Sequence, residues 1–207
     1  MTRSAWPPFI YTSQIQSLPD GKGLRGISSR MDSQLSGADI PPRPFKINYR
    51  PMTVEDIPQV HQLDQRSFSL PWPERSFLYE ITQNTNAITL VAEAVYENGQ
   101  RLIVGMIVVW LIVDEIHIGT VAVEAGFRRM GVGRQLVART LLAGAARGGS
   151  MAFLEVRRSN LGAQALYQQM GFEMAGERRR YYHDNQEDAL LMTLNRLNQA
   201  ILSRWVV

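Results

Sequence analysis

The 207-residue chain contains no cysteine, and Lys22 and Lys46 are the only lysines among its 22 basic residues. The lack of cysteine excludes disulfide bonds, thiolate zinc sites and catalysis by a thiol, and it fits a reducing compartment. Arginine, which carries the remaining positive charge, binds phosphate and carboxylate groups through paired hydrogen bonds. A biased genomic base composition would also produce this excess of arginine over lysine. The net charge of only +3 permits an anionic ligand without requiring a nucleic acid.

Long apolar runs are also missing. The longest, from Leu102 to Val113, is too short for a membrane-spanning helix, which needs roughly 20 apolar residues, and it contains Gly105. The N-terminus lacks the order of charged and then apolar residues that marks a secretory signal. We therefore expect a cytoplasmic protein with no membrane partner and no direct role in binding nucleic acid.

The first part of the chain lacks any sustained apolar period. Residues 1–45 are rich in proline, serine and glycine, so they cannot bury enough apolar surface to offset the entropy lost on ordering. We expect a disordered N-terminal extension there, one folded domain over residues 46–195, and a tail or short helix over residues 196–207. The expected state is a monomer.

In the folded part, the spacing of apolar residues predicts an α+β fold with the order β-α-α-β-β-β-α-β-α-β-β. Asn98-Gly99 is the sharpest hairpin signal. The strand–helix–strand crossover within residues 114–156 predicts one parallel pair of strands, so the sheet is mixed. The predicted helices cover residues 52–68, 74–83, 131–147 and 160–170, and the predicted strands cover 47–50, 87–96, 101–113, 115–123, 151–156, 172–181 and 189–194.

The stretch FRRMGVGRQL, from Phe127 to Leu136, joins a predicted strand to a predicted helix. The first turn of a helix offers unpaired N–H groups and the positive end of its dipole. Gly131 and Gly133 stand at this turn, where the missing side chains leave the backbone open to an anion. The segment therefore predicts a diphosphate-binding cradle, with further positive charge from Arg128, Arg129 and Arg134.

Three known phosphate-binding patterns can be compared with this stretch by spacing. The GxxxxGK[ST] loop fails because its lysine is absent. The dinucleotide pattern GxGxxG fails because Leu136 stands at its third glycine and because Val123 ends the preceding strand well before Gly131. The pattern Arg/Gln-x-x-Gly-x-Gly/Ala fits in full over residues 128–133.

This third pattern resembles the diphosphate-binding motif of the GNAT family of N-acetyltransferases, which use acetyl-CoA. The segments FLEVRRSNLGAQALYQQMGF and RRRYYHDNQEDALLM resemble the branch of that family that acetylates the N-terminal alanine of a small-subunit ribosomal protein. FSLPWPERSF resembles the segment between the family's first two helices. The resemblance covers residues 47–194 and implies a central splayed sheet, acetyl-CoA as co-substrate, no metal, and a protein N-terminus as partner.

Two residues are the catalytic candidates. Glu155 ends an apolar strand, and the resemblance makes it the general base for the incoming amine, directly or through water; the alternative is an ion pair with Arg157. The resemblance places Tyr167 near the thioester sulfur, where its hydroxyl could protonate the departing thiolate. The alternative for Tyr167 is a place at the edge of the core beside Leu166 and Met170.

The resemblance also implies a set of cofactor-binding residues. The strand before the motif would bind the pantetheine amides through its backbone, and the N–H of Val123 would stabilise the oxyanion; the alternative is ordinary ladder pairing. Asn160 would contact the cofactor while also capping the next helix. The full set is Val121, Ala122, Val123, Arg128, Arg129, Met130, Gly131, Val132, Gly133, Arg134 and Asn160.

Three aromatic residues are candidates for the acceptor site. The resemblance implies that Tyr181 and Tyr182 line a peptide groove, with strand packing as the alternative. Trp72, between two prolines, is either part of the acceptor wall or a loop anchor. The three histidines have no metal-ligand spacing, and no chemistry is assigned to them.

Rival functions remain open from the sequence. A small amine or a lysine could replace the N-terminal acceptor within the same fold. A non-catalytic module that binds acyl-CoA or the ribosome is a further possibility, but Glu155 and Tyr167 are both present. An α-amine has a pKa of about 7.7–8.0 and lysine one of about 10.4, so a single water-linked carboxylate suits the α-amine better.

Overall fold

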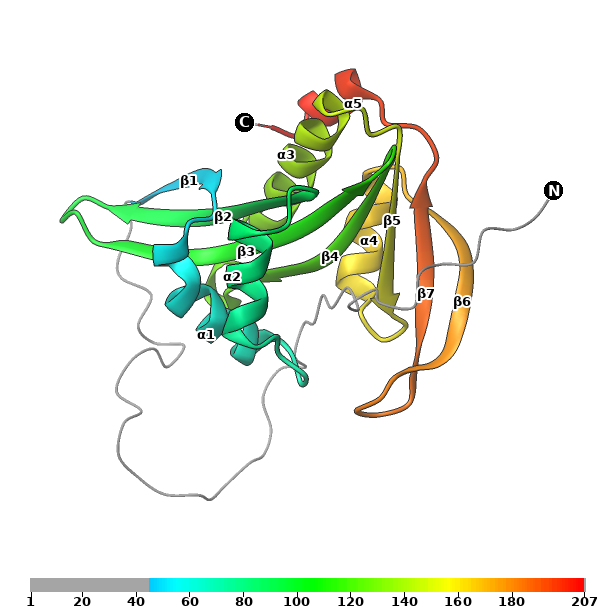
Figure 1. The fold of residues 1–207 in the computed structure, drawn as a ribbon, viewed down its shortest axis with the longest axis horizontal. Coiled ribbons are helices and arrows are strands. Elements are labelled where there is room, and N and C mark those ends of the chain that lie inside the picture. Colours follow the sequence, from blue (N-terminus) through cyan, green and yellow to red (C-terminus); the bar gives the residue numbers. More distant parts are fainter. Residues whose placement is uncertain (1–44, 207) are drawn as a thin grey trace.

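The computed structural model describes residues 45–206 (Figure 1). The extension expected over residues 1–45 lies outside the described residues except for Phe45. The strands are β1 (Phe45–Pro51), β2 (Ala87–Tyr96), β3 (Arg101–Ile112), β4 (Glu115–Val123), β5 (Met151–Arg157), β6 (Glu173–Tyr182) and β7 (Glu187–Leu194). The helices are α1 (Ile57–Ser67), α2 (Glu74–Thr82), α3 (Val132–Ala146), α4 (Leu161–Gln169) and α5 (Gln199–Ser203), with short 3-10 turns at Val54–Asp56 and Ala125–Phe127.

The predicted order of strands and helices is confirmed, and β2 and β4 have their predicted bounds. The first helix differs, because Val54–Asp56 form a 3-10 turn and α1 begins only at Ile57. The Thr53 N–H donates to the Asp56 carboxylate at 2.8 Å, which is the capping contact that their spacing predicts. Pro58 lies in the first turn of α1, where its missing N–H costs little.

The seven strands form one mixed sheet in the order β1-β2-β3-β4-β5-β7-β6. Every neighbouring pair is antiparallel except β4 and β5, which are parallel as predicted. Their parallel pairing runs only from Glu115↔Met151 to His117↔Phe153. Beyond these residues the two strands diverge and leave a wedge in the sheet, which is visible between the β4 and β5 arrows in Figure 1.

Helices cover the two faces of the sheet unequally. One core lies between the sheet and α3, α4 and α5, and it includes Leu136, Leu154 and Leu202. A second core packs α1 and α2, through residues such as Leu63 and Phe77, against β2, β3 and β4 only. The α1–α2 face of β5 and its neighbours is therefore left outside this second core. No helix within residues 45–206 is long and apolar enough to cross a membrane.

Candidate active site

The wedge between β4 and β5 exposes one edge of β4. Val121, Ala122 and Val123 pair with β3 along the opposite edge, so ordinary ladder pairing accounts for one edge only. The pairing with β5 has already stopped at His117. Backbone N–H and C=O groups along the last part of β4 therefore face the wedge, where an extended ligand with amide groups could pair with them.

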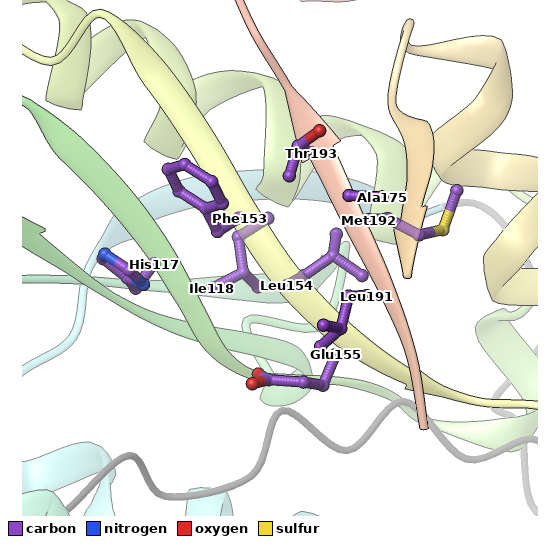
Figure 2. Close-up of a pocket in the computed structure, with 9 residues that line it drawn as sticks. All are labelled: His117, Ile118, Phe153, Leu154, Glu155, Ala175, Leu191, Met192 and Thr193. Carbon is purple, nitrogen blue, oxygen red and sulfur yellow. The ribbon is translucent and has the colours of Figure 1, made fainter. Parts of the chain in front are cut away.

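A cavity of about 260 Å³ lies where the two strands separate (Figure 2). It is on the face of the sheet that the second core leaves uncovered. Its lining is apolar apart from a few side chains, of which Glu155 and His117 are the titratable ones. The lining residues are His117, Ile118, Phe153, Leu154, Glu155, Ala175, Leu191, Met192 and Thr193.

The backbone at the start of α3, where the sequence predicts a cradle, is sharply bent. Gly131 caps the helix with φ +84°, and Arg129 has φ +63°, so left-handed residues bend the backbone on both sides of Met130. In the part of the chain that the structure describes, no acceptor contacts the N–H groups of Val132, Gly133 and Arg134. Consecutive N–H groups of this kind form a concave site for an anion.

The three arginines of the cradle have different surroundings. The Nε of Arg128 donates to the Val123 carbonyl at 3.1 Å, which ties the loop to the end of β4. The Arg134 guanidinium lies 4.9 Å from the ring centroid of Trp205, and its Nη2 is 3.3 Å from where a Cβ on Gly131 would stand. Arg129 is exposed. Trp205 was not predicted from the sequence, because it lies beyond the residues that carry the family resemblance.

Glu155 lies at the wedge with only 6% of its surface exposed. Its expected alternative partner was Arg157, and this alternative is wrong. Arg178 of β6 contacts the Glu155 carboxylate at 3.2 Å, across β7, which pairs with both strands. Burial, followed by the neighbouring Glu155 carboxylate, raises the pKa of Tyr181 to about 12. Glu155, Arg178 and Tyr181 thus form one polar cluster inside the site.

The three tyrosines of the prediction occupy unlike positions. Tyr167 is 1% exposed, with its ring 5.4 Å from that of Phe172, and burial followed by Tyr182 raises its pKa. It therefore remains a hydroxyl donor at neutral pH. Tyr182 is buried beneath the Arg157 guanidinium at 3.8 Å, which agrees with strand packing. Tyr181 is partly exposed beside the carboxylate.

Asn160 caps α4 as the sequence predicts. Its Oδ1 accepts a hydrogen bond from the Ala163 N–H at 3.2 Å, and only 4% of the residue is exposed. Gly133 of α3 faces the same region, because a Cβ there would stand 3.5 Å from Val123 and 3.8 Å from Leu166 of α4. The cradle, the end of β4 and α4 therefore meet at one place.

Arg157 is a structural residue that the sequence analysis underestimated. It is 1% exposed, and it pairs with Asp184 at 2.8 Å and with Glu187 at 3.2 Å, both at the connection between β6 and β7. Asp184 also accepts a hydrogen bond from Ser69, which follows α1. Arg157 therefore fastens the β6–β7 connection next to the α1–α2 connection, on the side where β5 ends.

Trp72 is placed as a loop anchor. It is 7% exposed, and its ring stacks on Trp110 with the centroids 6.0 Å apart. Its backbone N–H donates to the Asp64 Oδ2 at 2.6 Å. Asp64 is fully buried, burial raises its pKa to about 7, and its Oδ1 has no partner within residues 45–206. No feature of the sequence marks Asp64 as buried, since an aspartate in a helix is ordinarily exposed.

Within residues 45–206, no group of His, Cys, Asp and Glu side chains is arranged to hold a metal ion. His61 lies 3.7 Å from Glu74. His117, to which the sequence analysis assigned no chemistry, lines the cavity with Glu155. Figure 2 shows the two side chains on neighbouring strands at the border of the same space.

A family model described as the acetyltransferase (GNAT) family matches residues 57–172. The chain belongs to this family. A protein of Bacillus subtilis (strain 168) is 34% identical over 147 residues, which cover 71% of this chain and 94% of that protein. The [ribosomal protein bS18]-alanine N-acetyltransferase of Escherichia coli (strain K12) is 32% identical over 141 residues, or 67% of this chain and 90% of the relative.

Solved structures agree with this membership of the GNAT family. The crystal structure of the ribosomal-protein-S18-alanine N-acetyltransferase from Escherichia coli has a TM-score of 0.63 and 29% identity, and covers 74% of this chain and 96% of that one. A chain of the NatC complex, solved with Gag peptide and CoA, has a TM-score of 0.65 and 24% identity. The match covers 74% of this chain and 99% of the NatC chain. At this identity it shows the fold alone. The chain is thus an acyltransferase of the GNAT fold.

Proposed function

We propose that this GNAT enzyme moves the acetyl group of acetyl-CoA to the N-terminal α-amine of a protein, and that its acceptor is the N-terminal alanine of the small-subunit ribosomal protein bS18. One observation carries the proposal. Within residues 45–206, a helix start whose first N–H groups have no acceptor, a strand edge without a neighbouring strand and a buried carboxylate converge at the wedge between β4 and β5. The names of the bacterial relatives support the acceptor.

The residues present fit acetyl-CoA as co-substrate. The N–H groups of Val132, Gly133 and Arg134 would hold the diphosphate, and the Met130 and Arg129 backbone would close the cradle. Val121–Val123 would pair with the pantetheine amides, and Asn160 would add a contact from α4. When bound, acetyl-CoA supplies an activated thioester carbonyl. Arg128 holds the loop to β4 rather than acting only as a charge.

Proton affinity favours an α-amine as acceptor. At pH 7 roughly a tenth of α-amines are neutral, against well under one in a thousand lysines, given pKa values of about 7.7–8.0 and 10.4. This difference corresponds to about 3–4 kcal/mol in the free energy needed to form the neutral nucleophile. A single carboxylate such as Glu155 is adequate for the first case and much poorer for the second.

Three groups of this chain would carry the chemistry. Glu155, held by Arg178, would accept a proton from the amine, directly or through a water in the cavity. The Val123 N–H would stabilise the negative charge that develops on the carbonyl oxygen. The Tyr167 hydroxyl would donate its proton to the departing sulfur and regain one from the nitrogen of the tetrahedral intermediate. Direct attack needs no covalent enzyme intermediate, and the chain has no cysteine to form one.

The acceptor would approach from the side of the sheet where Arg157 holds the β6–β7 connection next to the α1–α2 connection. Tyr181, partly exposed beside Glu155, is the aromatic residue best placed to contact the peptide. Trp72 and Tyr182 would support this side from within the core, because both are buried.

The test uses labelled acetyl-CoA and the purified full chain. A peptide with the N-terminal sequence of bS18, beginning with alanine, is compared with the same peptide blocked at its N-terminus and containing an internal lysine, and with a polyamine. We expect label on the free N-terminus only, located by mass spectrometry. Label only on the lysine or the polyamine would overturn the acceptor, and no transfer with no heat of acetyl-CoA binding would overturn the activity.

A further inference from the structure

The proposed reaction leaves one proton to be removed from a buried site. A protonated α-amine loses two protons when it becomes an amide. Under the proposed function, Tyr167 would give its hydroxyl proton to the sulfur of CoA and regain one from the nitrogen of the tetrahedral intermediate, and Glu155 would receive the other amine proton. Glu155 is only 6% exposed, and Arg178 and Tyr181 lie against its carboxylate. This burial limits direct contact between the Glu155 carboxyl and bulk water, so a second group that takes the proton would restore Glu155 for the next turnover.

The cavity connects Glu155 with His117. Both side chains line the same space, which has a volume of about 260 Å³ (Figure 2). A water molecule occupies roughly 30 Å³ in the liquid, so the space has room for several. Most of the remaining lining is apolar, from Ile118, Leu154 and Leu191 among others. Water in this cavity would thus find its hydrogen-bonding partners mainly at the two titratable side chains.

His117 leads from the cavity to the surface. It is 6% exposed, its ring stacks on Phe153 at 5.3 Å, and its Nε2 lies 2.9 Å from the Glu115 Oε2. The Glu115 side chain is 40% exposed. A carboxylate only accepts hydrogen bonds, so the neutral ring carries its proton on Nε2 and Nδ1 is the basic nitrogen. Burial lowers the pKa of His117 despite Glu115, which keeps the ring neutral and able to accept a proton at pH 7.

We propose that His117 and Glu115 form a relay that carries the second proton of the amine from Glu155 to solvent. The N–H bond of the ammonium breaks and an O–H bond forms on Glu155. A cavity water then takes that proton and gives one to Nδ1 of His117. The Nε2 proton of the ring passes to Glu115 and from there to bulk water, which leaves the ring neutral with its proton on Nδ1; proton exchange with water restores the Nε2–H tautomer before the next turnover. His117 acts through Glu155, so it is a relay residue and does not touch the reacting atoms.

The test is chemical rescue of His117→Ala in the full chain, assayed with an alanine-initiated peptide at saturating acetyl-CoA. We expect a fall in kcat of at least about tenfold, in the lower range for a lost acid–base group, with unchanged acetyl-CoA affinity by calorimetry. Added imidazole restores the rate in a concentration-dependent way, because the enlarged cavity admits a base of the missing ring's size. Pyrazole, which has the same shape but is a far weaker base, does not restore it.

His61→Ala is the matched control, because His61 also faces a glutamate, Glu74 at 3.7 Å, but lies on α1 outside the cavity. Its rate stays within about twofold of the wild-type rate and does not respond to imidazole. A His117→Ala rate equal to wild type, or a loss that imidazole does not restore, overturns the relay. If His117→Ala does not fold, Glu115→Gln is the test, because the Glu115 side chain is exposed. We expect its kcat to fall severalfold, and an unchanged kcat would overturn the relay. An inactive wild type would instead overturn the proposed function.

Discussion

The Glu155 carboxylate is positioned by residues of another strand. Arg178 contacts it at 3.2 Å from β6, and Tyr181 of the same strand adjoins it. Such contacts fix the orientation of a buried carboxylate more firmly than its own strand does. A small displacement of β6 would therefore alter the direction in which Glu155 accepts a proton.

Glu155→Gln is expected to retain acetyl-CoA binding and to lose turnover. Glutamine keeps the size of the side chain but cannot accept the proton, so kcat should fall by about 10²- to 10⁴-fold. Calorimetry with acetyl-CoA and steady-state rates with the alanine peptide measure the two effects. Glu173→Gln, an exposed glutamate on β6, serves as control and should behave as wild type. An unimpaired rate in Glu155→Gln would remove Glu155 from the mechanism.

Single residues were predictable from the sequence to different degrees. The positions of Glu155 and of the Asn160 cap follow from local pattern, because a strand end and a helix start are local features. The partner of Glu155 did not follow. Arg178 reaches it only because β7 separates β6 from β5, and no local pattern encodes that order. Asp64 was missed for a similar reason, since its burial depends on the segment that carries Trp72.

At the scale of an element, the start of α3 depends on a left-handed residue. Gly131→Ala should weaken acetyl-CoA binding severalfold or more, because φ +84° costs alanine about 1 kcal/mol and its Cβ would stand 3.3 Å from the Arg134 Nη2. Gly148→Ala is the matched control. Gly148 has φ +100°, nothing lies within 4 Å of its Cβ, and it follows the opposite end of α3.

Both alanine variants should lose similar stability in thermal unfolding, since the backbone cost is the same. Only Gly131→Ala should lose affinity for acetyl-CoA in calorimetry. Equal losses of affinity in the two variants would mean that α3 acts through its overall stability. In that case the cradle assignment would be wrong.

The α1–α2 segment contains a group whose charge opposes folding. Burial raises the pKa of Asp64 from 3.8 to about 7. Between these values the folded state binds more protons than the unfolded state, so the free energy of unfolding should fall as pH rises from about 4 to 7 and level off above 7. The full cost is on the order of 4 kcal/mol at 1.36 kcal/mol per pKa unit.

Asp64→Asn should remove this decline, because asparagine can still accept the Trp72 N–H and carries no charge. Urea unfolding of both proteins between pH 4 and 8 measures the difference. Glu97→Gln, an exposed residue in the turn after β2, controls for the loss of one negative charge. A parallel pH dependence for Asp64→Asn and wild type would contradict the assignment.

The elements themselves were largely readable from the sequence. Runs rich in Ile, Val and Thr, divided by the Asn98-Gly99 turn, predict β2 and β3, and glycine and asparagine mark the helix ends. The short 3-10 turn before α1 was not foreseen, because the apolar period of the helix continues through it. The place at which β4 and β5 part came only from the family resemblance. Apolar strands with and without a partner have the same pattern.

At the scale of the whole molecule, Arg157 joins segments that are distant in the sequence. Arg157→Ala should lower the free energy of unfolding by about 3–5 kcal/mol, because it leaves Asp184 and Glu187 without their buried cation. The KM for the peptide should also rise, since Ser69 and the β6–β7 connection would separate. Chemical denaturation and peptide kinetics measure both effects.

Arg158→Ala is the control for Arg157→Ala. Arg158 is the next residue, 52% of its side chain is exposed, and it pairs with Glu177 and Asp188. An exposed pair contributes about 0–1 kcal/mol, so this variant should lose little. If the two variants lose equal stability, or if Arg157→Ala leaves the peptide KM unchanged, Arg157 does not join the two connections as described.

The short junction between β4 and β5 has a consequence for how the sheet responds to its ligand. Three residue pairs connect the two halves of the sheet, so the amide hydrogens of β4 that face the wedge, unlike those bonded to β3, can exchange with deuterium from the solvent. An extended molecule lying in the wedge would act as an eighth strand and slow that exchange. The sheet would then be most rigid while the ligand is bound in the wedge. It would become more flexible each time the product leaves, so its rigidity would change within every catalytic cycle.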